Sequence, residues 1–113
     1  MSITIYHNPR CSKSRQTLQL IEEAGKEVTI VEYLKDPLDR HQLVQLVNEL
    51  NIDVDALLRK KECKDHDVDP AELDLTGKID AIAKYPKIME RPVVVTDKGA
   101  AICRPPERVL ELI

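Results

Sequence analysis

The sequence predicts an α/β domain in which a mixed four-stranded sheet is flanked by helices. Two strand patterns enclose an amphipathic helix at the beginning of the chain, and two more precede a final helix at its end. The stretch between these halves, at about residues 38–88, carries helical patterns alone. A chain of 113 residues can bury its own core without disulfides or metal, so we expect residues 1–113 to form one domain with a helical insert.

The first half of the sheet is predicted as strand, helix, strand. Residues 2–6 alternate, with Ile3 and Ile5 on one face, and residues 27–34 are rich in β-branched side chains. A helical pattern lies between them from about Ser14. Because a helical crossover joins parallel strands, we expect these two strands to run parallel.

The first helix is defined by its apolar stripe and its ends. The stripe consists of Leu18, Ile21 and Ala24. Ser12 or Ser14 is expected to cap the N-terminus through its hydroxyl, and Gly25 is expected to end the helix.

The insert is expected to hold three helices that start near Asp39, Asp53 and Thr76, all residue types that cap helices. The apolar stripe of the first of these helices is Leu43, Leu46, Val47 and Leu50. Residues 62–68 are polar and predict an exposed loop, and Asp69-Pro70 favours a brief helical turn.

The chain closes with a predicted hairpin and helix. Valines at 93–95 predict a buried strand, residues 97–99 a turn and residues 100–104 the partner strand. A last helix is expected to begin at Pro105. The resulting order, β-α-β, helical insert, β-β-α, is that of the thioredoxin-like fold.

Composition excludes several classes of protein. The net charge is −3, which gives no basic footprint for DNA or RNA, and there is no Trp or Phe to stack on bases. No signal peptide is visible, and no apolar run approaches the ~18 residues of a membrane span. The three cysteines form no metal-binding spacing, and their odd number suits a reducing cytosol, so we expect a cytoplasmic protein without a metal.

The most informative stretch is residues 6–15, Y-H-N-P-R-C-S-K-S-R. Cys11 lies where the first strand gives way to a helix, and the positive end of a helix lowers a thiol pKa and attracts oxyanions. We expect Arg10, Lys13 and Arg15 to lower this pKa further and Cys11 to be a nucleophile. The alternative, a cysteine that is merely a small buried hydrophobe, is disfavoured by its polar and cationic neighbours.

Other side chains of this stretch have less specific patterns. His7 could stabilise the thiolate, orient the loop or simply pack. Asn8 and Ser14 fit loop closure or capping better than catalysis, although Ser14 could donate to a sulfur or an oxyanion.

Three arginines stand at the ends of predicted elements: Arg59, Arg91 and Arg104. Arginine holds oxyanions through a planar fork of donors. Each one alone could be a solvated surface residue, but loops at element ends are where a shared site would be assembled. Pro92 precedes the buried strand, and by itself it is expected to be trans.

Four ordered motifs carry a family resemblance. The stretch H-N-P-R-C-S-K-S-R, followed by L-L-R-K, R-P-V-V-V-T and C-R-P-P-E, resembles the glutaredoxin-coupled arsenate reductases from Ile3 to the C-terminus. The family has a small residue before the cysteine and Gly-Thr after it. This chain has Arg10, Ser12 and Lys13 there, which suggests the arsenate reductase-like branch.

The resemblance implies roles for individual residues. Cys11 matches the cysteine that attacks arsenate, and His7 the histidine associated with lowering its pKa. Ser14 and Arg15 match the end of the cysteine motif and are assigned to the substrate site. The remaining matches are the oxyanion-binding arginines Arg59, Arg91 and Arg104 and the cis-proline Pro92.

The resemblance also implies a reaction. Arsenate would be reduced to arsenite through a covalent Cys11–arsenic adduct that glutathione and glutaredoxin resolve. The implied protein is a monomer with glutathione as co-substrate and no bound cofactor. The alternatives are a thiol oxidoreductase acting on another substrate, such as a glutathione mixed disulfide, or an Spx-like protein-binding redox regulator. Spx-type proteins carry a second cysteine where this chain has Ser14, which disfavours that redox switch.

Two cysteines lie outside the predicted site. Cys103 is expected to be structural. For Cys63, a role as an internal resolving cysteine is disfavoured.

Overall fold

A computed structural model describes residues 2–113 of the protein and divides them into two compact units. The sheet unit holds the described residues up to Asp36 together with Arg91–Ile113. The helical unit is Pro37–Glu90, close to the insert expected at about residues 38–88. That the two units form one thioredoxin-like domain stays a prediction.

The sheet unit contains the mixed four-stranded sheet that the sequence predicted. Its strands are β1 (Thr4–Tyr6), β2 (Thr29–Val31), β3 (Val93–Thr96) and β4 (Gly99–Ile102), in the spatial order β2-β1-β3-β4. β1 is parallel to β2 and antiparallel to β3, and β3 and β4 form a hairpin. The spatial order makes β1 and β3 the two central strands, and the segment that carries Cys11 follows β1 directly in the chain.

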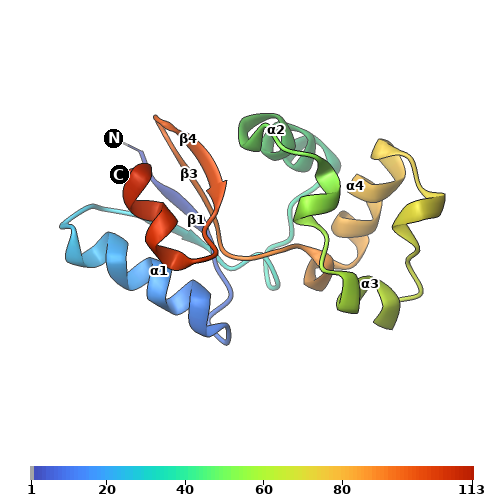
Figure 1. Ribbon diagram of the computed structural model, residues 1–113, viewed down its shortest axis with the longest axis horizontal. Helices are drawn as coiled ribbons and strands as arrows, with labels where there is room; N and C mark the ends of the chain where they lie inside the picture. The colour runs from blue at the N-terminus through green and yellow to red at the C-terminus, as the bar shows by residue number, and fades with distance from the viewer. Residues whose placement is uncertain (1) are drawn as a thin grey trace. The chain divides into compact units, whose positions relative to one another are not determined.

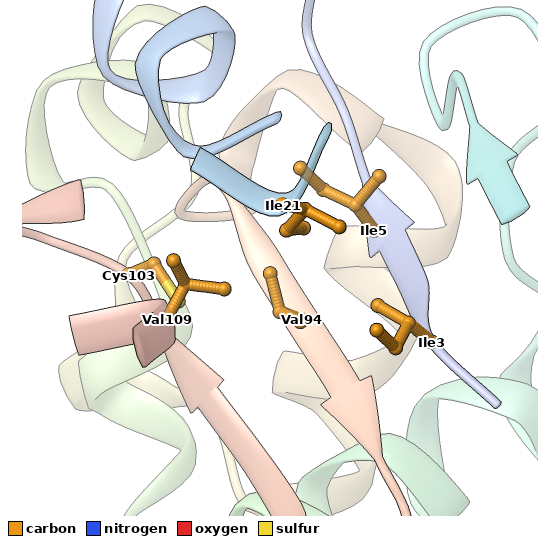
Figure 2. Close-up of a cluster of buried hydrophobic side chains, with 6 residues drawn as sticks. All are labelled: Ile3, Ile5, Ile21, Val94, Cys103 and Val109. Atoms are coloured by element: carbon orange, nitrogen blue, oxygen red, sulfur yellow. The ribbon is translucent and has the colours of Figure 1, made fainter. Parts of the chain in front are cut away.

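Two helices in the sheet unit pack side by side, α1 (Ser12–Glu23) and the 3₁₀ helix η4 (Pro106–Glu111), as Figure 1 shows. They meet the sheet in a cluster of buried side chains drawn in Figure 2: Ile3, Ile5, Ile21, Val94, Cys103 and Val109. Ile5 of β1 and Ile3, the residue before that strand, both reach this cluster, as their alternation predicted.

The helical unit is built from short elements. They are α2 (Arg40–Leu50), η1 (Val54–Leu57), α3 (Lys60–Asp65), η2 (Pro70–Glu72), α4 (Leu75–Lys84) and η3 (Pro86–Ile88). Asp39 caps α2 in a reciprocal capping box with Gln42. Arg40 and Asp80 join α2 to α4 through two hydrogen bonds of 2.7 Å each. Within residues 2–113, no helix has both the length and the apolar character that a membrane crossing requires.

The largest local error in the prediction concerns residues 62–68. The expected exposed loop is instead half occupied by α3, and Cys63 within it is buried. A six-residue helix shows too little periodicity to be recognised when one apolar residue stands among lysines and acids. The N-terminal end of α3 is anchored by the backbone bridge between Leu58 and Met89.

Several boundaries also differ from the prediction. The second strand spans Thr29–Val31 rather than residues 27–34, and Asp74, not Thr76, caps α4. The hairpin turn is shorter than expected because Gly99 already pairs with Thr96. The last helix is 3₁₀ and begins at Pro106.

Candidate active site

Cys11 occupies the N-cap position of α1, directly after the loop that leaves β1. Its backbone is extended (φ −92°, ψ 122°), and its side chain makes no capping hydrogen bond. The expected cap by Ser12 or Ser14 is therefore wrong, because the helix begins one residue after the cysteine. The Cys11 N–H donates to the Asn8 carbonyl at 3.0 Å, and the Arg15 N–H donates to the Cys11 carbonyl at 3.0 Å. These bonds fix the thiol at the positive end of a 12-residue helix.

The surroundings of Cys11 lower its pKa. Partial burial on its own raises the pKa of the Cys11 thiol, but hydrogen bonds from the backbone N–H groups of Ser14 and Lys13 lower it. The Arg91 guanidinium lowers it as well, through its charge and through a hydrogen bond to the sulfur. These donors outweigh burial, so the pKa of the Cys11 thiol lies below its ordinary value and the thiolate is easier to form.

The expectation that Arg10, Lys13 and Arg15 lower the pKa of Cys11 is wrong. Beside the backbone N–H groups of Ser14 and Lys13, the cation that lowers the pKa is Arg91, 80 positions away in the chain, and not the side chain of Arg10, Lys13 or Arg15. All three of those side chains are exposed. The Arg15 guanidinium is bound to the Pro9 carbonyl at 2.9 Å, so in this structure it closes the loop.

His7 and Ser14 form a buried polar pair behind the cysteine. The His7 Nδ1 atom lies 2.6 Å from the Ser14 Oγ atom, and the Asn8 N–H donates to the same oxygen at 3.1 Å. The His7 N–H donates to the Val31 carbonyl at 2.8 Å, which ties the loop to β2. Burial lowers the pKa of His7, with Glu32 opposing and Arg15 assisting, so the ring is neutral at pH 7. This arrangement supports orientation of the loop by His7 rather than a cation beside the sulfur.

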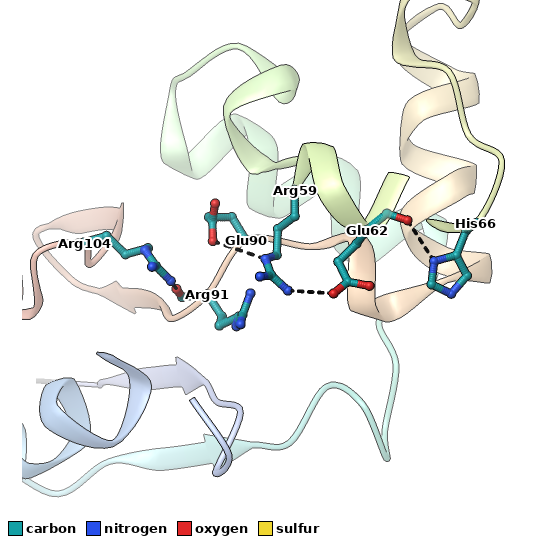
Figure 3. Close-up of polar contacts among 6 residues, drawn as sticks. All are labelled: Arg59, Glu62, His66, Glu90, Arg91 and Arg104. Carbon is teal, nitrogen blue, oxygen red and sulfur yellow. Dashed lines mark hydrogen bonds and ion pairs between the residues drawn. The ribbon is translucent and has the colours of Figure 1, made fainter. Parts of the chain in front are cut away.

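Arg104 contacts the segment that carries Arg91. Its Nη1 atom donates to the Arg91 carbonyl at 3.2 Å, and Figure 3 shows these two residues. The Cys103 N–H donates to the Pro92 carbonyl at 2.9 Å. The Arg91–Pro92 peptide bond is cis, as the resemblance implied. The Arg104–Pro105 bond is cis too, which the sequence reasoning missed. The sheet unit thus links Cys11 to Arg91, and Arg91 to Arg104.

Arg59 belongs to the helical unit, where it stands at the N-cap of α3 between two carboxylates. Its Nη1 atom lies 3.2 Å from Glu62 Oε1, and its Nε atom lies 3.9 Å from Glu90 Oε1 (Figure 3). The backbone is held as well, because the Arg59 N–H donates to the Ile88 carbonyl at 2.8 Å. Neither glutamate was selected from the sequence, and the only signal available was that Glu90 directly precedes Arg91.

The two other cysteines are buried. Burial raises the pKa of Cys63. Burial also raises the pKa of Cys103 to about 11, against the opposing charge of Arg108. Both thiols are therefore protonated at neutral pH, which agrees with a structural role for Cys103. Across residues 2–113, no three His, Cys, Asp or Glu side chains gather in a way that could hold a metal ion.

Comparison with known proteins gives a consistent family match. The model of the ArsC family matches residues 6–112. An arsenate reductase of Escherichia coli strain K12 is 44% identical over 99% of this chain and 81% of its own length. A protein of the same strain called uncharacterized protein YfgD is 44% identical over 98% of this chain and 96% of its own. The solved structure of an arsenate reductase from Vibrio cholerae has a TM-score of 0.94 at 39% identity, covering 100% of this chain and 98% of that one.

Proposed function

This chain belongs to the ArsC family and is an oxidoreductase of the arsenate reductase kind, and we propose that it reduces arsenate to arsenite with the Cys11 thiolate as nucleophile. The observation that carries the proposal is the environment of Cys11. Two backbone N–H groups and the Arg91 guanidinium converge on one sulfur at a helix N-terminus and lower its pKa. Donors arranged in this way favour the thiolate form of the cysteine, and they also attract an anion to the helix N-terminus.

The first step forms the covalent adduct. The Cys11 sulfur attacks arsenic, an arsenic–sulfur bond replaces an arsenic–oxygen bond, and the oxygen leaves as water after taking up protons. Negative charge stays on the remaining arsenic oxygens. The Arg91 guanidinium acts on the Cys11 sulfur through its charge and a hydrogen bond, and this supports the proposal that it offsets the charge on the arsenic oxygens.

The later steps use external thiols, because Cys63 and Cys103 are buried and protonated. A glutathione thiol replaces a second arsenic-bound oxygen, which leaves as water. A glutaredoxin thiolate then attacks the glutathione sulfur and forms a mixed disulfide, and the two electrons of the broken arsenic–sulfur bond reduce arsenic from the +5 to the +3 state. Water finally displaces Cys11, and arsenite leaves.

Arg59 and Arg104 complete the proposed oxyanion site. Arg104 is tied to the Arg91 carbonyl within the sheet unit. Arg59 is held to Glu90, the residue directly before Arg91 in the chain. Three guanidinium groups on one small oxyanion would supply the bidentate donors that a tetrahedral anion accepts. His7, Ser14 and Arg15 act in this proposal by holding the cysteine loop in place.

The proposal also covers the setting of the reaction. Glutathione is a co-substrate and glutaredoxin a protein partner, the enzyme works as a cytoplasmic monomer, and no prosthetic group takes part. Family membership supports these points.

The test is arsenate-dependent consumption of reducing equivalents with glutathione and glutaredoxin supplied. Turnover is expected for the wild type and is expected to vanish in Cys11→Ser, whose hydroxyl cannot form the adduct. Cys63→Ser is the matched control and should retain turnover, since its thiol takes no part. Wild-type activity no higher than that of Cys11→Ser would overturn the proposal. Loss of activity in Cys63→Ser with the fold intact would replace external resolution by an internal one.

A further inference from the structure

Arg59 is the one of the three proposed oxyanion-binding arginines that stands in the helical unit, and it already has anionic partners there. Glu62 Oε1 lies 3.2 Å from Arg59 Nη1, within hydrogen-bond distance. Glu90 Oε1 lies 3.9 Å from Arg59 Nε, which is an ion pair without a hydrogen bond. Figure 3 shows the two carboxylates on either side of the guanidinium. Together these three side chains carry one positive and two negative charges.

The three side chains are mostly withdrawn from solvent. Arg59 is 27% exposed, Glu62 20% and Glu90 25%. Charges in such a position interact more strongly than fully exposed pairs, because less water screens them. An oxyanion that binds Arg59 therefore shares the guanidinium with the Glu62 carboxylate and approaches two negative charges.

The backbone keeps this arrangement in place. The Arg59 N–H donates to the Ile88 carbonyl at 2.8 Å, and the Glu90 N–H donates to the Leu57 carbonyl at 2.7 Å. The segments on both sides of the bridge between Leu58 and Met89 are thus fixed to each other. Glu62 follows Arg59 by three residues, one turn along α3, which holds its carboxylate on the same side.

We propose that Glu62 and Glu90 set the oxyanion affinity of the site by competing with the bound oxyanion for the Arg59 guanidinium. The inference rests on the proposed function, because it assumes that Arg59 contacts the oxyanion. It assigns to the two glutamates the role of limiting how tightly an oxyanion is held. They weaken the binding of dianions such as sulfate, phosphate and arsenate, so the site does not stay occupied by an anion that the thiol cannot reduce.

The competing possibility is that the carboxylates only position Arg59 for its ligand. The two roles predict opposite signs. If Glu62 and Glu90 compete, replacing either by glutamine keeps the shape, removes the charge and tightens oxyanion binding. If they position, the same replacement loosens the guanidinium and weakens oxyanion binding.

The experiment is sulfate binding measured by titration calorimetry at constant ionic strength, since a thiol does not reduce sulfate. Glu62→Gln and Glu90→Gln are each expected to lower the Kd for sulfate by about two- to fivefold, the range of a partly exposed ion pair. Glu49→Gln is the matched control, because it removes the same charge from an exposed position on α2 and should leave the Kd unchanged.

Measurements in an Arg59→Ala background separate this inference from the proposed function. Arg59→Ala alone should raise the Kd for sulfate, and adding Glu62→Gln to it should give no further change. An unchanged or raised Kd in Glu62→Gln and Glu90→Gln, with Arg59→Ala still weakening binding, overturns the competition and leaves the arginine site standing. An unchanged Kd in Arg59→Ala removes Arg59 from the proposed site, and the competition with it.

Discussion

The His7 Nδ1 atom and the Ser14 Oγ atom lie 2.6 Å apart, buried beneath the loop that carries Cys11. Ser14 also accepts a hydrogen bond from the Asn8 N–H, and its own backbone N–H stabilises the Cys11 thiolate. Ser14 therefore contacts both the cysteine loop, through His7 and Asn8, and the nucleophile itself. The loop conformation and the thiol pKa are expected to change together.

Replacing Ser14 by alanine tests this coupling. Ser14→Ala leaves the buried His7 nitrogen and the Asn8 N–H without their hydroxyl partner, so we expect a loss of about 1–3 kcal/mol in the free energy of unfolding. The loosened loop should also raise the Cys11 pKa. Urea unfolding and the pH dependence of iodoacetamide alkylation measure the two effects. Ser12→Ala, at an exposed position one residue after the cysteine, serves as the control and should change neither.

Arg91 is expected to be the cation that sets the Cys11 pKa. Arg91→Ala removes a charge and a hydrogen bond from the sulfur, so the thiol pKa should rise toward its ordinary value. The alkylation rate at pH 7 then falls roughly tenfold for each unit of that rise, because only the thiolate reacts.

The contrast with the neighbouring cations makes this prediction specific. Arg10→Ala and Lys13→Ala should leave the alkylation midpoint unchanged, because Lys13 acts through its backbone N–H and both side chains are exposed. A midpoint that moves in Lys13→Ala and stays in Arg91→Ala would contradict the assignment.

Cys103 should make the protein less stable at high pH. Its folded pKa of about 11 lies above the ordinary value of 9.0, so between these values the unfolded chain loses a proton that the folded chain keeps. The contribution of Cys103 to the free energy of unfolding is fully present below pH 9.0. It falls as the pH rises toward 11, by at most about 1.4 kcal/mol per pH unit. Urea unfolding of the wild type and Cys103→Val at pH 8 and pH 10 isolates the effect. An equal loss of stability in both proteins would show that Cys103 does not contribute.

The core beneath the sheet should respond to truncation at its centre. Ile21 is fully buried between α1 and the strands, so Ile21→Ala is expected to cost about 2–5 kcal/mol of unfolding free energy through lost burial and a residual cavity. Leu110→Ala in η4 is the comparison, since its side chain is 53% exposed and its loss should cost far less. Thermal or urea unfolding of both variants gives the difference.

Much of the fold followed from the sequence because its signals are local. Alternation in residues 2–6 and the stripe of α2 each reflect one buried face, whereas the consecutive valines at 93–95 reflect a strand covered on both faces. The burial of these side chains agrees with both patterns. The ends of short elements were less predictable. α3 has six residues and one buried position, too few for a periodic pattern.

The sequence by itself determined that Cys11 would stand between a strand and a helix, since a strand pattern, a proline and a helical stripe are properties of neighbouring residues. It also provided, through the family motifs, the arginines expected to bind an oxyanion. Only the tertiary structure decided which charges reach those groups. Arg91 acts on Cys11 because β3 lies beside β1, whereas the adjacent Arg10 and Lys13 extend into water. Glu90 reaches Arg59 because a backbone bridge joins segments 31 positions apart, and Glu62 reaches it from one turn along α3. Electrostatic interactions depend on distance and burial in space, and neither can be read from the order of residues along the chain.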